Sequence, residues 1–192
     1  MAKPVGFVWN PDSFYAYSIN YPHIYFYGSI SKNNIYSDYA AKRVFDKLSK
    51  QVTENINSLE TDYYVFSSPE LSNPLLKDPN ISIEDYFKEY WMDYVYIKLF
   101  LNQNNANIQN IVSSLYNATN NLPSFNGKLL IYLGDSNLLT QCKEYIETHD
   151  KLYFEFYKIS DNSFVGSFDI NNGHVSVTEY TLKNMAGNRL SK

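Results

Sequence analysis

The sequence contains a single cysteine, Cys142, among its 192 residues. One cysteine cannot close an intramolecular disulfide, so noncovalent packing alone has to hold the fold. Such a low cysteine count is typical of a reducing compartment, and we expect a cytoplasmic protein or one assembled from a reducing cytoplasm. Residues 1–10 also lack a basic segment followed by an apolar run, so no secretory signal is expected.

Long apolar runs and metal-ligand motifs are missing as well. No stretch approaches the roughly 18 apolar residues of a membrane helix, so we expect no membrane partner. The histidines, His23, His149 and His174, form no H-x-x-x-H or H-E-x-x-H pair, and no metal site is predicted. Neither standard glycine-rich phosphate-binding fingerprint is present, and no cofactor is predicted.

Charge is scarce and slightly acidic. Charged residues make up 19% of the chain and the formal net charge is −4. Long-range attraction to a phosphate backbone is therefore weak, and nucleic acid is an unfavoured partner. The densest basic cluster lies in residues 42–50, where acidic side chains are interleaved with it. We interpret this cluster as a solvated helix face.

Aromatic residues are abundant instead. The chain has 19 tyrosines and 12 phenylalanines and is also rich in asparagine. This aromatic content, together with 44% hydrophobic residues, excludes an intrinsically disordered chain. The length fits one compact unit. We expect a single α/β domain over residues 1–192, with residues 1–22 as an N-terminal strand appendage.

Short apolar runs that stop at small polar residues predict buried strands. Three such strands are expected at residues 23–27, 63–66 and 128–133. Asn172-Gly173 is a strong hairpin signal, because these residues tolerate the positive φ of a tight turn. The remaining expected strands are 6–9 and 14–19 near the N-terminus, and a C-terminal meander at 152–159, 164–170 and 175–181.

Helical periodicity occupies the intervening segments. After Ser37 or Asp38, either of which can cap a helix, apolar residues recur on one helical face from Val44 to Leu59. Ser82 begins an [ST]-x-x-[DE] helix start, and the segment that follows is apolar or aromatic on nearly all sides. The expected helices are 38–59, 84–103, 108–115 and 138–146.

The order of these elements predicts an α/β fold with a mainly parallel three-layer sheet, helical crossovers and a C-terminal antiparallel β-meander. In particular, residues 24–27, 64–66 and 129–133 are expected to be neighbouring parallel strands of one sheet.

Small polar residues follow each of these three strands. Open α/β sheets bind ligands beyond the carboxyl ends of their strands, and helix N-termini there attract anions. One hypothesis is therefore a nucleotide or nucleoside pocket; the other is that these are ordinary turn and cap residues. The residues concerned are Gly28, Ser29, Ser31, Ser67, Ser68, Glu70, Gly134, Asp135 and Ser136.

Gly134-Asp135-Ser136 resembles the start of the motif of the GDSL hydrolases. Asn137 stands where that motif has leucine, the tripeptide lies late in the chain, and no Asp-x-x-His follows it. The resemblance therefore implies no catalytic triad. Cys142 falls on the apolar stripe of its helix and is expected to be an inert buried thiol. No residue is predicted to be catalytic, and an enzyme is the less favoured interpretation.

The aromatic segment 84–103 gives the other clue to function. Phe87, Tyr90, Trp91 and Tyr94 lie within one turn of each other on the expected helix, and such residues are enriched at protein interfaces. A central helix inside the core is the alternative. We therefore favour a non-catalytic protein-interaction or assembly component, as in a multiprotein apparatus, a virion or a toxin–immunity pair, with a protein partner or a second copy. The alternative is a small-ligand enzyme or sensor that acts at the strand ends.

Overall fold

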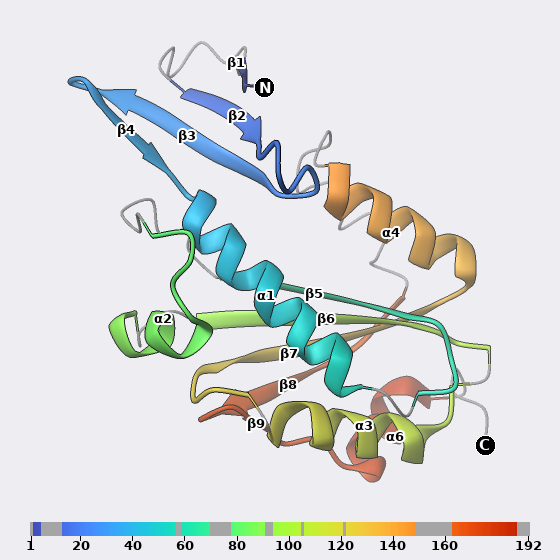
Figure 1. Cartoon of the computed structure of the whole chain (residues 1–192). Coiled ribbons are helices and arrows are strands. Elements are labelled where there is room, and N and C mark those ends of the chain that lie inside the picture. The colour runs from blue at the N-terminus through green and yellow to red at the C-terminus, as the bar shows by residue number, and fades with distance from the viewer. Residues whose placement is uncertain are drawn as a thin grey trace.

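A computed structural model describes residues 2–4, 13–56, 59–69, 78–90, 94–104, 106–120, 122–148 and 163–187. Its strands form two separate sheets (Figure 1). The N-terminal sheet is antiparallel and contains, in spatial order, β1 (Ala2–Pro4), β2 (Ser13–Tyr17), β3 (Tyr25–Ser31) and β4 (Asn34–Ser37). The five-stranded sheet contains, in spatial order, β5 (Tyr63–Pro69), β6 (Tyr94–Asn102), β7 (Asn126–Gly134), β8 (Phe164–Asn171) and β9 (His174–Val175).

Helices cover both faces of the five-stranded sheet. None of the helices in the described part of the chain is long and apolar enough to cross a membrane. The helices are α1 (Tyr39–Asn55), α2 (Ile83–Glu89), α3 (Ile108–Asn120), α4 (Ser136–Thr148) and α6 (Glu179–Ala186).

The five-stranded sheet is mixed and mostly antiparallel, so the prediction of a mainly parallel three-layer sheet is wrong. Only β6 and β7 run parallel, with α3 between them in the chain. The pairs β5–β6, β7–β8 and β8–β9 are antiparallel. Residues 24–27 belong to the other sheet, and β6 separates β5 from β7, which run in opposite directions. The three segments are therefore not neighbouring parallel strands.

The error originates in residues 94–102, which form β6 and not the second half of a helix. Successive residues of β6 face opposite sides of the sheet, and both sides are covered, so the strand is apolar on both faces. A fully buried helix gives the same pattern, and periodicity cannot separate the two. Helix α2 begins where expected, with the Asp85 N–H donating to Ser82 Oγ at 3.0 Å, but it ends at Glu89.

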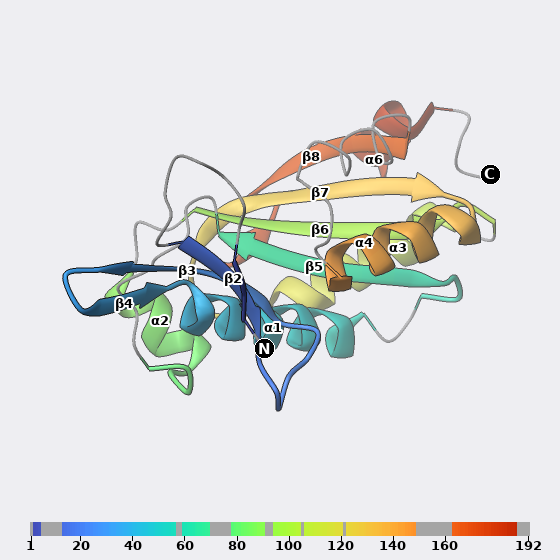
Figure 2. The same cartoon turned by 90° about the horizontal axis from the view of Figure 1, so that it is seen from above.

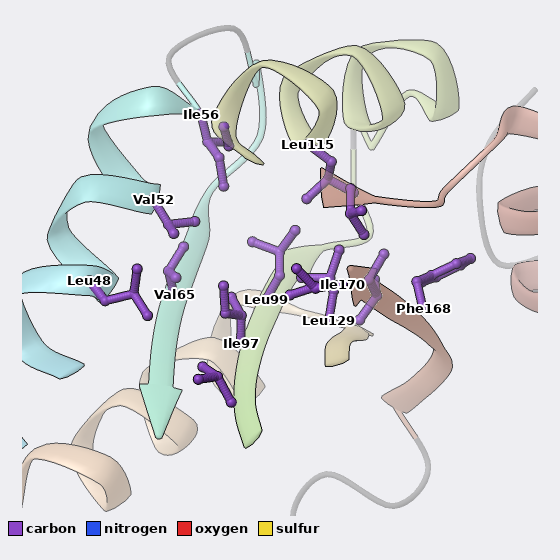
Figure 3. Packing of buried hydrophobic residues seen from close by; sticks show 14 of the residues in the cluster. Leu48, Val52, Ile56, Val65, Ile97, Leu99, Leu115, Leu129, Phe168 and Ile170 are labelled. Carbon is purple, nitrogen blue, oxygen red and sulfur yellow. The ribbon is translucent and has the colours of Figure 1, made fainter. Parts of the chain in front are cut away.

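Helix α1 confirms the predicted helix and carries the main core. Its apolar stripe points at the sheet, and Leu48, Val52 and Ile56 lie opposite Val65 of β5 (Figure 3). Asp38 occupies the N-cap position, but its carboxylate makes no capping bond. It accepts a hydrogen bond from the Tyr27 N–H at 2.8 Å, which ties the helix start to β3 of the N-terminal sheet.

The opposite face of the sheet carries a smaller core under α4. Phe100 and Tyr132 stack with ring centroids 4.8 Å apart, and Leu139 and Cys142 of α4 pack on them. The predicted helix 138–146 is confirmed within α4. The five-stranded sheet is therefore enclosed between α1 and α3 on one face and α4 on the other.

The C-terminal segment agrees only in part with the expected meander. The predicted hairpin turn is confirmed, with φ of 52° at Asn172 and 81° at Gly173 between β8 and β9. The predicted strand 175–181 is replaced by the two-residue strand β9 and the start of α6. Thr178 is the N-cap of α6 and forms a capping box with Thr181. The predicted strands 6–9 and 152–159 lie outside the described residues. The single-domain prediction remains a prediction, and the N-terminal sheet extends as far as Ser37.

The packing of Phe87 predicts a large cost of truncation. Its side chain is 4% exposed and stacks on Phe125 with ring centroids 4.8 Å apart. We expect Phe87→Ala to lower the free energy of unfolding by roughly 3 to 5 kcal/mol, because it leaves a cavity in the main core. Chemical denaturation measures this change. Tyr116→Ala, at a ring 60% exposed on α3, is the control and should change stability by less than about 0.5 kcal/mol. Equal effects of the two variants would contradict the packing described.

Cys142 should react with thiol reagents only after denaturation. It lies on the face of α4 that packs on the sheet and is fully buried, and burial raises the pKa of its thiol to about 11, so thiolate is scarce at neutral pH. Labelling followed by mass spectrometry, with and without guanidinium chloride, checks this. In a Cys142→Ala background, a cysteine placed at the exposed Thr140 (Thr140→Cys) should label rapidly without denaturant. Rapid labelling of native Cys142 would contradict its buried position.

Candidate functional site

The residues predicted to share one pocket lie at three separate places. Gly28 and Ser29 are inside β3, and Ser31 is its last residue. Ser67 and Ser68 lie at the carboxyl end of β5, while Gly134 ends β7. Asp135 and Ser136 follow it at the start of α4. Glu70 lies outside the described residues.

The opposite directions of β5 and β7 keep these strand ends apart. Ser68 is paired with Tyr96, which in turn is paired with Lys128 near the start of β7. Gly134 is paired with Asn102 at the other end of β6. The structure therefore brings Ser67 and Ser68 together but places Gly134 at the opposite end of the strands, on β7 in the middle of the sheet. A pocket shared by these strand ends required parallel strands.

Local roles account for the two polar residues after β7. Asp135 Oδ1 accepts from the Leu138 N–H at 2.8 Å, as a residue before a helix does. Ser136 Oγ accepts from Asn102 Nδ2, also at 2.8 Å, which joins the start of α4 to the end of β6. These bonds agree with the alternative hypothesis of turn and cap residues.

The predicted aromatic interface is not one helical face. Phe87 is buried in the main core, and Tyr90 follows the end of α2 with its ring centroid 5.0 Å from that of Tyr86. Tyr94 is the first residue of β6, beside Tyr96 at 5.7 Å. Trp91 lies outside the described residues. Because the helix ends at Glu89, these side chains do not share the helical surface on which the interface hypothesis was based.

A cleft of about 400 Å³ lies elsewhere, along the free edge of β5. Helix α1 forms one wall, residues 63–68 of β5 form the floor, and Lys143 of α4 and the segment 23–25 complete the boundary. Figure 2 shows β5 as the strand of its sheet nearest to α1 and to the N-terminal sheet. Ser67 and Ser68 are the only residues of the predicted pocket that line this cleft in the part of the chain described.

The wall formed by α1 is a second stripe beside its apolar one. Residues three and four apart share a helical face, and the stripe therefore runs from residue 42 to residue 53. Apart from the core residue Phe45, this stripe carries charged and hydroxyl side chains, whereas the neighbouring stripe carries apolar side chains of the core. Its members are Lys42, Phe45, Asp46, Ser49, Lys50 and Thr53. The sequence showed this spacing, but interpreting the basic residues as a solvated face missed the cleft.

Backbone groups of β5 contribute to the floor. The Asn102 N–H donates to the Asp62 carbonyl at 2.9 Å, so even-numbered residues of the strand pair with β6. The N–H and C=O groups of Tyr63, Val65 and Ser67 therefore point toward the cleft. The Ser67 N–H donates to Ser49 Oγ at 2.8 Å, which closes this end of the edge against α1.

The cleft has an excess of positive charge. Lys42, Lys50 and Lys143 line it, and Asp46 is the one carboxylate among its described lining residues. Asp46 is already engaged, with Lys50 Nζ at 2.8 Å and His23 Nε2 at 3.1 Å from its two oxygens. An incoming anion would therefore find ammonium groups on both walls and little repulsion.

The His23–Asp46 pair does not extend to a nucleophile. Among the described residues, no hydroxyl or thiol is hydrogen-bonded to His23. The nearby Ser49 hydroxyl donates to the Phe45 carbonyl at 2.9 Å and accepts from the Ser67 N–H. No three His, Cys, Asp or Glu side chains in the described ranges are grouped so that they could hold a metal ion.

A further lysine lies next to the cleft, on the strand behind β5. Lys98 of β6 is 8% exposed, and its ammonium lies 5.7 Å from the centre of the Phe66 ring. Burial and the nearby charge of Lys42 lower the pKa of Lys98 to about 8. The like charges of Lys42 and Lys98 are thus held close together in the folded protein.

The lowered pKa of Lys98 predicts that this residue destabilises the folded protein and that the loss of stability depends on pH. The ordinary pKa is 10.5, so between about pH 8 and pH 10.5 the unfolded chain binds more protons at this residue, and stability rises with pH. We expect Lys98→Met to be more stable than the wild type by about 3 kcal/mol at pH 7, with the difference shrinking toward pH 10.5. Denaturation of both proteins across this range measures it. A stability difference between the two proteins that stays constant with pH would contradict a lowered pKa of Lys98.

Comparison with known proteins relates the chain to a known fold. No protein-family model matches it, and no curated protein matches its sequence. The structure is similar to the crystal structure of a DUF5037 family protein from Ruminococcus gnavus, with a TM-score of 0.65 over 97% of this chain and 90% of that one. The two sequences are 14% identical. At this identity the similarity shows a shared fold alone.

Proposed function

We propose that this chain is a non-catalytic binding protein and that its ligand is an anion held in the cleft along β5. The observation that carries the proposal is the charge of that cleft. Lys42, Lys50 and Lys143 come from two separate helices and surround one cavity, in a chain whose net charge is −4. The single lining carboxylate among the described residues, Asp46, is paired with Lys50, which leaves Lys42 and Lys143 as the lining ammonium groups that no lining carboxylate compensates.

The energetics of the cleft favour an occupant with carboxylate or phosphate groups. Ammonium groups around one cavity repel each other, and an anion between them removes that repulsion. Hydrogen bonds to charged groups contribute roughly 1.5 to 3 kcal/mol each. Ser68 adds a hydroxyl, and Tyr63 and Tyr64 add aromatic walls. The volume lies within the range of about 300 to 1,000 Å³ that is usual for ligand pockets.

The proposal keeps the hypothesis of a non-catalytic interaction or assembly component, with the cleft in place of the aromatic helix as the contact surface. The alternative of a nucleotide-type enzyme or sensor loses its support, because the carboxyl ends of β5 and β7, on which it was based, point to opposite ends of the sheet and β3 belongs to another sheet. No described residue of the cleft presents an activated nucleophile.

Charge reversal in the cleft tests the proposal. Citrate and inorganic phosphate serve as probes, and the amide NMR shifts of residues 42–53 and 63–68 report binding at low salt. Replacing two lysines on opposite walls, Lys42→Glu with Lys143→Glu, should weaken citrate binding about tenfold or more, since each lost contact is worth over about 1 kcal/mol. Both residues lie away from the core.

The matched control changes the net charge equally at a distance. Lys32→Glu with Lys183→Glu alters two exposed lysines, on the β3–β4 turn and on α6. This double variant should bind citrate within about twofold of the wild type. Equal weakening in both double variants would indicate a general charge effect, and no shift with either anion would contradict an anion site in the cleft.

A further inference from the structure

We propose that the cleft binds an extended acidic segment of a partner protein, which adds to the free edge of β5 as a further strand. This inference rests on the proposed function and specifies its ligand: a polypeptide whose main chain pairs with β5 and whose carboxylates meet the lysines. It joins two features of one site, a row of outward backbone groups and positive charge on both walls.

The backbone of β5 is suited to strand addition. The strand is seven residues long and pairs without irregularity with β6 along its whole length. In the part of the chain described it has no neighbour on its other side, where Val65 directs its N–H and C=O into the cleft. No described residue bonds to these two groups. Exposed strand edges of this kind are templates for an incoming strand.

The strand at the opposite edge of the same sheet, β9, offers no comparable length of free backbone. β9 has only two residues, and α6 begins soon after it. On β5 the edge is closed at Ser67 by the Ser49 hydroxyl, so the open backbone is limited to the stretch around Val65. A short peptide segment, and not a folded domain or a long strand, matches this opening and the volume of the cleft.

The positions of the lysines account for the acidic character of the segment. Successive side chains of a strand point to opposite faces of the sheet. Lys42 and Lys50 belong to α1, which covers one face, and Lys143 belongs to α4, which covers the other. A strand added to β5 would therefore direct alternate side chains at α1 and at α4. A run with carboxylates in both alternating sets satisfies both walls, whereas a single carboxylate satisfies one.

Backbone methylation of a synthetic peptide separates main-chain pairing from charge. The parent probe is the capped peptide Thr-Glu-Val-Glu-Glu-Val-Glu-Thr, which carries carboxylates in both alternating sets. Two derivatives bear N-methyl groups on the odd or on the even amides, so that sequence and charge stay the same. Only alternate N–H groups of an added strand face β5. One derivative should therefore lose the pairing, and the other should direct its methyl groups away from the sheet.

We expect the parent peptide to bind the full chain at least tenfold more tightly than citrate does, measured by titration calorimetry. One methylated derivative should bind roughly tenfold more weakly than the parent, and the other within about threefold of it. The amide signal of Val65 should shift with the parent and with the tolerated derivative. The Lys42→Glu and Lys143→Glu double variant should weaken the parent, and the Lys32→Glu and Lys183→Glu control should not.

Failure of this inference and failure of the proposed function give different results. If both methylated derivatives bind as well as the parent, while the cleft variant still loses binding, the cleft holds anions through charge alone and strand addition is wrong. If citrate binds and the parent peptide does not, a small anion is the ligand and the inference is again wrong. If neither the peptides nor the anions bind, the proposed function is wrong as well.

Discussion

The burial of β6 on both faces is the constraint on which the rest of the structure depends. Seven of its nine residues are buried and the other two, Tyr94 and Tyr96, are half-buried, so each face of the sheet needs its own cover. Helices α1 and α3 supply one cover and α4 supplies the other. With β7 paired on one side of β6 and β5 on the other, β5 becomes the edge of the sheet in the described part of the chain.

Helix α1 connects this constraint to the cleft. The stripe from Leu48 to Ile56 has to face the sheet, and the helix is therefore fixed in rotation. That rotation brings the adjacent stripe, with Lys42 and Lys50, to the edge of β5. At its start, the helix is joined to the N-terminal sheet by the bond from Tyr27 to Asp38 and by the rings of Phe26 and Tyr39, 5.0 Å apart. The cleft is thus a consequence of packing required for the core.

Local signals in the sequence predicted individual elements well. The periodicity of α1, the Ser82 cap of α2 and the Asn172-Gly173 turn each depend on residues within a few positions of one another. Residues 94–102 were assigned wrongly because a fully buried strand and a fully buried helix are both apolar throughout. Of the residues predicted to bind a ligand, only Ser67 and Ser68 line the cleft in the described part of the chain, and the lysines of α1 were missed because they are indistinguishable in sequence from a solvated helix face.

The sequence by itself determined which stretches are apolar on one face, where helices begin and where one hairpin turns, because short-range contacts and backbone preferences decide these. It also determined that no disulfide supports the fold. Tertiary structure alone decided the directions of the strands, the edge position of β5 and the meeting of Lys42 with Lys143 at one cleft. Those features depend on contacts between residues far apart in the chain, and a side-chain pattern records that a face is buried but not what covers it.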